Sequence, residues 1–299
     1  MRSTFNHTSI VARDEHHFCA LPTTKWYDCL VDGILLLIFV FPVTTVAQDQ
    51  LTESPQSSHA AESVPNQAVV FILDCSQSMA DLQPSPLGPV STFTVAKHSF
   101  VEVLQPLARR NEAGMGPYTL VGVRFFGHRA GWGIDAVPPR IRLQKTYTGV
   151  IPLDLSPSLD VELIKALGRF GQGEFQSVAK QLESVKPWGE SPLFLSLEQS
   201  LADFENVPRG VEKSIIAITN GRDEQFRPTK FLPEVLNAWQ RKREIEIHIL
   251  GFNIPQHQAA IARREHIRLA NATDGSYSEI RSGRELSKQL EEILNLDGN

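Results

Sequence analysis

Cysteine is scarce in this sequence: three occur among 299 residues. Cys19 and Cys29 lie within residues 1–47, which are assigned below to a leader, so Cys75 would stand alone in the mature chain. An intramolecular disulfide and a zinc site built from thiolates are then both excluded. A lone Cys at the end of a strand is more often a small buried residue than a reactive thiol, since no cationic partner stands beside it in the sequence.

Basic residues are fewer than acidic ones, with 29 Lys and Arg against 34 Asp and Glu. The formal net charge is −5, and the chain has no basic stripe of the kind that binds nucleic acid or an anionic membrane. No Gly-x-Gly-x-x-Gly or Walker-type loop follows any apolar run, so nucleotide binding has no support. No run of five like charges and no internal repeat is present. These absences favour a partner that is neither nucleic acid nor nucleotide.

Long apolar runs are lacking too. Near the N-terminus residues 34–41 are continuously apolar before Pro42, whereas a membrane-spanning helix needs roughly 20 such residues. The run suits the central region of a secretory signal, with Thr45-Val46-Ala47 as the cleavage site. The preceding segment, 1–32, is long for such a signal and is not positively charged. We predict a leader over 1–47 and export to the periplasm or beyond, with membrane contact only through an uncleaved leader.

The remaining chain divides at a change in composition. Residues 48–67 are polar, rich in Ser, Gln and Pro, and lack periodicity, which predicts a flexible linker. From 68 to 299 short apolar runs alternate with amphipathic segments, which predicts βα units around a parallel sheet. The fold class is therefore α/β: one doubly wound, mostly parallel sheet flanked by helices.

The expected elements follow from the period of the apolar positions. Strands are predicted at 68–73, 118–126, 214–219, 244–251 and 276–280, with a possible edge strand at 141–151. Helices are predicted at 92–107, 159–170, 175–185, 192–204, 231–242, 256–271 and 285–294.

Oxygen-bearing side chains gather where these strands end. Asp74 closes the first buried strand, and Ser76 and Ser78 follow in the next loop. Ser191 opens a helix, and Thr219-Asn220 ends another buried strand. Because ligands of open parallel sheets bind outside the carboxyl ends of the strands, these donors are expected to converge. Hard oxygen donors suit Mg²⁺, Mn²⁺ or Ca²⁺ and not zinc.

The three loops together resemble the metal-ion-dependent adhesion site of von Willebrand factor type A domains. Asp74-Cys75-Ser76-Gln77-Ser78 has the pattern Asp-x-Ser-x-Ser, 189–193 reads Gly-Glu-Ser-Pro-Leu where the family has Gly-x-Thr-Pro-Leu, and 219–221 reads Thr-Asn-Gly for Thr-Asp-Gly. Residues 121–129 and 270–294 also resemble the family's bacterial members. The resemblance implies a metal site that leaves one coordination position open for a partner's Asp or Glu carboxylate. Its implied ligands are Asp74, Ser76, Ser78, Ser191 and Asn220.

Two positions depart from the family pattern. Ser191 replaces Thr and keeps the hydroxyl, whereas Asn220 replaces Asp and removes one negative charge. Since divalent affinity rises with the number of charged ligands, the resemblance here implies a weakly bound or absent Mg²⁺, Mn²⁺ or Ca²⁺. An Asn carbonyl can still accept a hydrogen bond or ligate, and Asp223 lies close enough in sequence to substitute.

Several other assignments stay open from the sequence. Ser76 and Ser78 could form only a helix-capping turn. A metal-assisted hydrolase would have Asp223 and Glu190 as its candidate bases. His128, Arg129 and Trp132 lie in the segment 127–133, whose mixed composition suits a partner-contact surface.

The sequence thus predicts a non-catalytic protein-binding module that recognises a partner carboxylate through a divalent cation. The alternatives are a metal-independent interaction domain of the same fold, in which the site has decayed, and the hydrolase.

Overall fold

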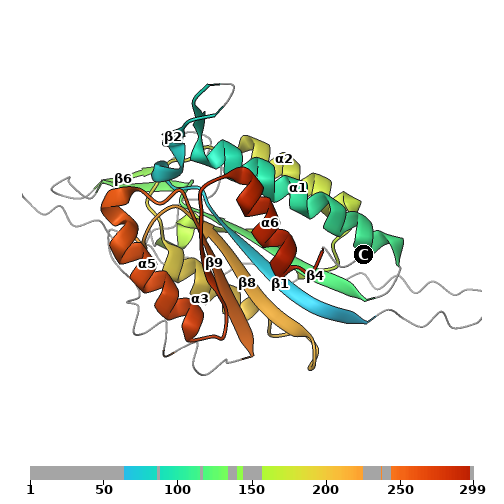
Figure 1. Ribbon diagram of the computed structural model, residues 1–299. Coiled ribbons are helices and arrows are strands. Elements are labelled where there is room, and N and C mark those ends of the chain that lie inside the picture. Colours follow the sequence, from blue (N-terminus) through green and yellow to red (C-terminus); the bar gives the residue numbers. More distant parts are fainter. Residues whose placement is uncertain are drawn as a thin grey trace, which may run out of the picture. The chain divides into compact units, whose positions relative to one another are not determined.

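A six-stranded sheet forms the centre of the structure (Figure 1). The computed structural model describes residues 64–85, 88–114, 117–133, 140–143, 157–224, 237 and 244–296, without the side chains of 131–133, 140–143 and 157. The predicted leader, 1–47, and the linker up to residue 63 lie outside this range. Among the described residues, no helix combines the length and the apolar character needed to cross a membrane.

The sheet has the strand order β10-β9-β8-β1-β4-β7. All of its pairings are parallel except that between β4 and β7. The predicted α/β class with a mostly parallel sheet is therefore confirmed. The strands are β1 (Pro65–Asp74), β4 (Tyr118–Phe126), β7 (Val161–Gly168), β8 (Glu212–Thr219), β9 (Ile245–Phe252) and β10 (Tyr277–Ile280).

Helices cover both faces of this sheet, because its central strands are apolar on both faces. In β1, Val69, Phe71 and Leu73 belong to one core, whereas Ala68, Val70 and Ile72 belong to the other. The first core is covered by α1 (Thr92–Ala113), α2 (Gln172–Ser184) and α6 (Gly283–Ile293), and the second by α3 (Leu193–Asp203) and α5 (Gln256–Asn271) (Figure 1).

The helix predicted at 159–170 is wrong. This segment forms a short 3₁₀ turn, η2 (Pro157–Asp160), followed by the edge strand β7. Val161, Ile164 and Leu167 do recur at helical spacing, but the outer edge of buried β4 needs hydrogen-bond partners, and β7 provides them. β7 is an edge strand and is only half covered. Apolar and polar residues therefore do not alternate along it in the way that would identify a strand, and Leu163 is 47% exposed.

The described start of the strand predicted at 141–151 does not join the main sheet. Its start belongs to β6 (Arg140–Leu143), which pairs with β5 (Ala130–Gly133) in a separate antiparallel ribbon. A second small ribbon, β2 (Leu82–Gln83) with β3 (Val90–Ser91), leads into α1 and was not predicted. Residues 144–151 and, apart from Asn237, the helix predicted at 231–242 lie outside the described residues.

Candidate functional site

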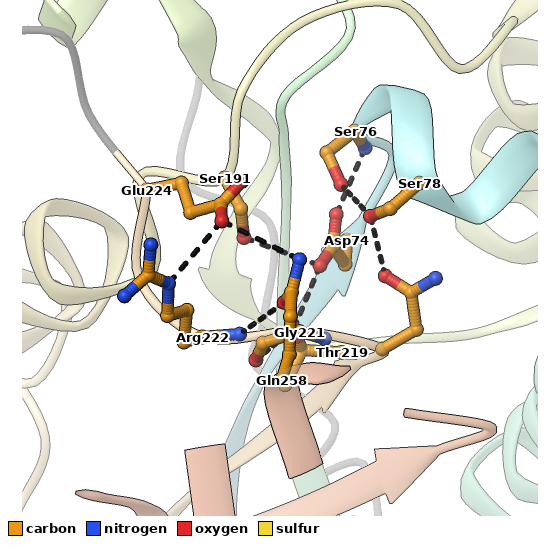
Figure 2. Close-up of polar contacts among 10 residues, drawn as sticks. Asp74, Ser76, Ser78, Ser191, Thr219, Gly221, Arg222, Glu224 and Gln258 are labelled. Atoms are coloured by element: carbon orange, nitrogen blue, oxygen red, sulfur yellow. Dashed lines mark hydrogen bonds and ion pairs between the residues drawn. The ribbon is translucent and has the colours of Figure 1, made fainter. Parts of the chain in front are cut away.

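Three loops meet at the carboxyl edge of the sheet (Figure 2). The first loop, 75–80, follows β1 and includes the 3₁₀ turn η1 (Gln77–Ala80). The second loop, 189–192, leads into α3, and the third loop, 220–224, follows β8. Because β1 and β8 are parallel neighbours, their carboxyl ends bring the first and third loops together.

Asp74 is the centre of the arrangement and is fully buried. Its Oδ1 accepts a hydrogen bond from the Ser76 backbone N–H (2.8 Å). Its Oδ2 accepts from the hydroxyls of Thr219 (2.7 Å) and Ser191 (3.3 Å), so this one carboxyl joins the first and second loops to the end of β8 (Figure 2). Burial raises the pKa of the Asp74 carboxyl, and the hydrogen bonds from Ser76, Thr219 and Ser191 oppose that rise.

A second chain of contacts links the remaining predicted ligands. The hydroxyls of Ser76 and Ser78 lie 3.1 Å apart, and Ser78 Oγ donates to Asn220 Oδ1 at 2.7 Å. Asn220 is 1% exposed, and its Nδ2 has no hydrogen-bond partner within the described structure. The structure therefore brings together all five residues that the sequence singled out, with the carbonyl end of Asn220 facing Ser78.

The chemistry of this donor set fits a hard divalent cation. One carboxylate, three hydroxyls and one amide carbonyl are oxygen ligands of the kind that Mg²⁺ and Ca²⁺ take. Nowhere in the described ranges do three or more His, Cys, Asp or Glu residues group so as to hold a metal ion. The site would therefore depend on neutral oxygens around the single charge of Asp74.

Backbone hydrogen bonds fix the three loops against one another. Gln77 N–H donates to Gly189 C=O (2.8 Å), joining the first loop to the second. Ser191 and Glu224 exchange a pair of backbone hydrogen bonds at 3.0 and 2.8 Å, joining the second loop to the third. The positions of the five oxygens are thus set by main-chain contacts as well as by their own side chains.

Asp223 has a different role from the substitute ligand considered in the sequence. Its Oδ1 accepts from the Phe194 backbone N–H (2.7 Å) at the start of α3. This satisfies an N–H that the helix itself leaves free, since the N-cap residue Pro192 offers no side-chain bond. The third loop therefore caps the helix that follows the second loop.

Asp160 supports the site and was not predicted from the sequence. It is fully buried, and its Oδ1 accepts from the backbone N–H groups of Arg129 (2.6 Å) and Ala130 (3.0 Å). Burial raises the pKa of this carboxyl well above its usual range. Gly189 packs directly on Ala130, so the turn that Asp160 fixes lies beneath the second loop. Only contacts between distant segments reveal this role.

One residue of the contact surface predicted at 127–133 is buried. His128 is 6% exposed, and its Nε2 lies 2.9 Å from Glu162 Oε2, so it is an interior residue and not an exposed one. Arg129 lies 3.7 Å from the same carboxylate and is partly exposed. Trp132 lies in β5, and its side chain is outside the described residues.

Cys75 lies between two site residues but is not placed for reaction. Its side chain is fully buried, and burial raises the thiol pKa well above its usual range. The reactive thiolate is therefore disfavoured, and the interpretation of Cys75 as a small buried residue is confirmed.

Helix α5 supports the third loop from the other side. Gln258 accepts from Arg222 N–H (3.3 Å) and donates to Glu224 Oε1 (3.4 Å). About two turns further along, His266 is fully buried, with its ring 5.6 Å from that of Tyr277. Burial lowers the pKa of His266 from 6.5 to about 4.

This burial predicts acid sensitivity. Between pH 6.5 and 4 the unfolded chain binds a proton at His266 that the folded domain does not, so stability is lost as pH falls through that window. We expect His266 to contribute about 2 kcal/mol to the loss of unfolding free energy between pH 7 and pH 5. Urea unfolding at both pH values should show that loss reduced in His266→Leu but unchanged in His257→Gln, an exposed His on the same helix. An equal loss in His266→Leu and the parent would contradict the prediction.

Comparison with known proteins yields structural neighbours only. No protein-family model and no curated protein matches the chain. The pilus adhesin SpaC from Lactobacillus rhamnosus GG superposes with a TM-score of 0.55 at 16% identity, over 78% of this chain and 31% of that one. The D319A mutant of the PilB minor pilin from Streptococcus sanguinis gives 0.52 at 14% identity, over 79% and 62%. A von Willebrand factor type A protein from Catenulispora acidiphila gives 0.47 at 16% identity, over 77% and 42%.

A parallel sheet with helices on both faces and a site at the carboxyl ends of its strands defines a doubly wound α/β domain. Its particular fold is that of von Willebrand factor type A domains, as the resemblance of the three loops implied. This chain spans less than two thirds of each of the three neighbours described above. At such low identity the similarity concerns the fold and not the activity.

Proposed function

We propose that this domain is a non-catalytic protein-binding module that recognises a partner's Asp or Glu carboxylate through a divalent cation. The observation that supports it is the convergence of five oxygen-bearing side chains from three loops, tied by the Asp74–Ser191 and Ser76–Ser78–Asn220 contacts. The ion would be Mg²⁺, Mn²⁺ or Ca²⁺, held by Asp74, Ser76, Ser78, Ser191 and Asn220.

Each group would contribute according to its chemistry. Asp74 supplies the negative charge, and the hydroxyls of Ser76, Ser78 and Ser191 supply neutral oxygens. When bound, the cation supplies an electrophilic centre that a carboxylate can ligate. Because the neutral ligands compensate little of its charge, the ion would attract an incoming carboxylate strongly.

A binding role fits these residues better than hydrolysis does. Hydrolytic catalysis by a hydroxyl needs an adjacent base, whereas the Ser76 and Ser78 hydroxyls contact each other and Asn220. The His128 ring does not supply such a base, because its Nε2 faces Glu162 Oε2 at 2.9 Å. Asp223, one of the two candidate bases, is engaged at the start of α3.

An exported location accords with this role. The predicted leader at 1–47 would direct export, and two solved structures with this fold are a pilus adhesin and a minor pilin. Both names describe proteins of the cell exterior, which supports an extracytoplasmic protein partner for this chain as well.

Cation titration tests the proposal. Calorimetric titration of Mg²⁺ and Mn²⁺ into the full chain should detect binding in about the millimolar range, which Asp74→Ala abolishes. Asn220→Asp restores the second carboxylate and should tighten binding about tenfold. Asn271→Asp, which adds the same charge at the far end of α5, is the matched control and should leave the affinity unchanged.

The Asn220→Asp variant also separates the alternatives. If it binds Mn²⁺ while the parent does not, the geometry of the site has survived without the ion. Metal dependence would then be wrong, and metal-independent recognition by the same fold would replace it.

A further inference from the structure

Asn220 is followed by a glycine, and this pair carries chemistry that cation binding does not use. The backbone nitrogen of the residue after an asparagine can attack the side-chain amide and close a cyclic imide. A side chain on that next residue obstructs the closure, and glycine has none. Of all the Asn residues in the chain, Asn220 alone precedes a Gly.

The contacts of the Asn220 amide favour its cleavage. Its Oδ1 accepts from the Ser78 hydroxyl at 2.7 Å, and the Ser76 hydroxyl lies 3.1 Å from that of Ser78. A donor at this oxygen stabilises the negative charge that forms on it when the carbonyl carbon is attacked. Nδ2, the nitrogen that must leave, is buried without a hydrogen-bond partner among the described residues. Because an unpaired buried donor is costly, its departure is favoured.

The attacking nitrogen has a route for its proton. Gly221 N–H donates to Thr219 Oγ1 at 3.3 Å, and Thr219 Oγ1 donates to Asp74 Oδ2 at 2.7 Å (Figure 2). A backbone amide is a poor nucleophile until it loses that proton, and a carboxylate reached through one hydroxyl can take it. Asp74, Thr219 and Ser78 thus surround one peptide unit as base, relay and oxyanion donor.

We infer that Asn220 is a self-modification site, at which the folded chain converts the side-chain amide into an aspartate. The Gly221 nitrogen bonds to Asn220 Cγ, and the bond from Cγ to Nδ2 breaks. Nδ2 leaves as ammonia, with the proton that Gly221 lost returned to it through water. One water molecule then opens the imide at Cγ, which restores the ordinary backbone. The net change is amide plus water to carboxylate plus ammonia, and no other reactant is needed.

The product would place a second carboxylate beside Ser78. Divalent affinity rises with the number of charged ligands, so the modified chain should hold Mn²⁺ more tightly than the newly synthesised one. This consequence rests on the proposed function, whereas the modification itself does not. The affinity of the site would therefore rise as the chain ages.

Incubation of the full chain at neutral pH in water labelled with oxygen-18 tests the inference. The new carboxylate carries one labelled oxygen, so mass spectrometry distinguishes this conversion from any that occurs later during proteolysis in ordinary water. Conversion at Asn220 should be at least about tenfold faster in the folded chain than in urea, since only folding holds Ser78 and Thr219 in place. Asn271, which is exposed and precedes Ala272, should stay unchanged.

Two variants locate the chemistry. Gly221→Ala places a methyl group on the attacking residue and should slow conversion about tenfold or more. It should fold, because Gly221 has no left-handed φ and its Cβ would meet only the flexible end of Gln258. Ser78→Ala removes the donor to Oδ1 and should reduce the folded rate toward that in urea. Ser177→Ala, at an exposed Ser on α2, is the matched control and should leave the rate unchanged.

The outcomes separate this inference from the proposed function. Conversion that is no faster in the folded chain than in urea, or that is unaffected by Ser78→Ala, overturns the inference and leaves the cation site standing. Isoaspartate as the main product also overturns it, because that product lengthens the main chain of the third loop. Conversion to aspartate without Mn²⁺ binding before or after it overturns the proposed function and leaves the modification standing.

Discussion

Gly127→Ala is expected to lower the unfolding free energy by about 2 to 5 kcal/mol, the sum of a backbone cost of about 1 to 2 and a steric cost of about 1 to 3. Gly127 adopts φ +81, where any other L-residue is strained. A Cβ at this position would lie 2.7 Å from both the Glu190 carbonyl oxygen and the Ser76 nitrogen. Both of these neighbours are backbone atoms of the first and second loops, so neither can rotate away as a side chain could.

The cost should extend beyond stability to the site. Gly127 C=O accepts from Gly189 N–H (2.8 Å), so a shift at Gly127 moves the loop that carries Ser191. Thermal or urea unfolding of the full chain measures the first effect, and Mn²⁺ titration measures the second.

Gly210→Ala isolates the steric part. Gly210 has a similar φ of +84, but a Cβ there meets nothing within 4 Å. It should lose only the backbone cost, about 1 to 2 kcal/mol. Similar losses in Gly127→Ala and Gly210→Ala would show that the contacts at Gly127 relax freely, contrary to the prediction.

The location of the site could be predicted because it depends on local sequence and one general rule. The apolar runs before Asp74 and Thr219 identify buried strands, and parallel strands end at the same edge of a sheet. The donors that follow those runs therefore had to be neighbours. Ser191 was placed by its resemblance to the family's second loop, and the structure brings it to Asp74.

The contacts that hold the site could not be predicted in the same way. Asp160 is distant in sequence from the loops it supports, and the fact that Asp223 accepts from Phe194 N–H depends on where α3 starts relative to the third loop. The helix prediction for the β7 segment was wrong for a related reason. Its conformation is decided by pairing with the edge of β4, and the sequence of 159–170 itself carries no sign of that partner.

A buried ion pair between β4 and α3 gives the second large prediction. Arg124 donates from Nε and Nη2 to the two carboxylate oxygens of Asp203, both at 2.7 Å, and each side chain is 10% exposed. Such a bidentate pair is strong while intact, but its removal on one side leaves an uncompensated charge in the core. Asp203→Asn is therefore expected to cost about 3 to 5 kcal/mol of unfolding free energy.

The pair matters for more than its own energy, because α3 begins directly after the second loop. Replacing both partners, as Arg124→Met with Asp203→Leu, removes the stranded charge and should restore stability to within about 1 kcal/mol of the parent. Glu244→Gln breaks the pair that Lys213 forms with the solvent-exposed Glu244 (3.3 Å), and it should cost less than about 1 kcal/mol. If urea unfolding gave Asp203→Asn and Glu244→Gln equal losses, the Arg124 charge would have found another partner or water. Apolar packing alone would then hold α3 in place, and Asp203→Asn should leave the Mn²⁺ affinity of the proposed site unchanged.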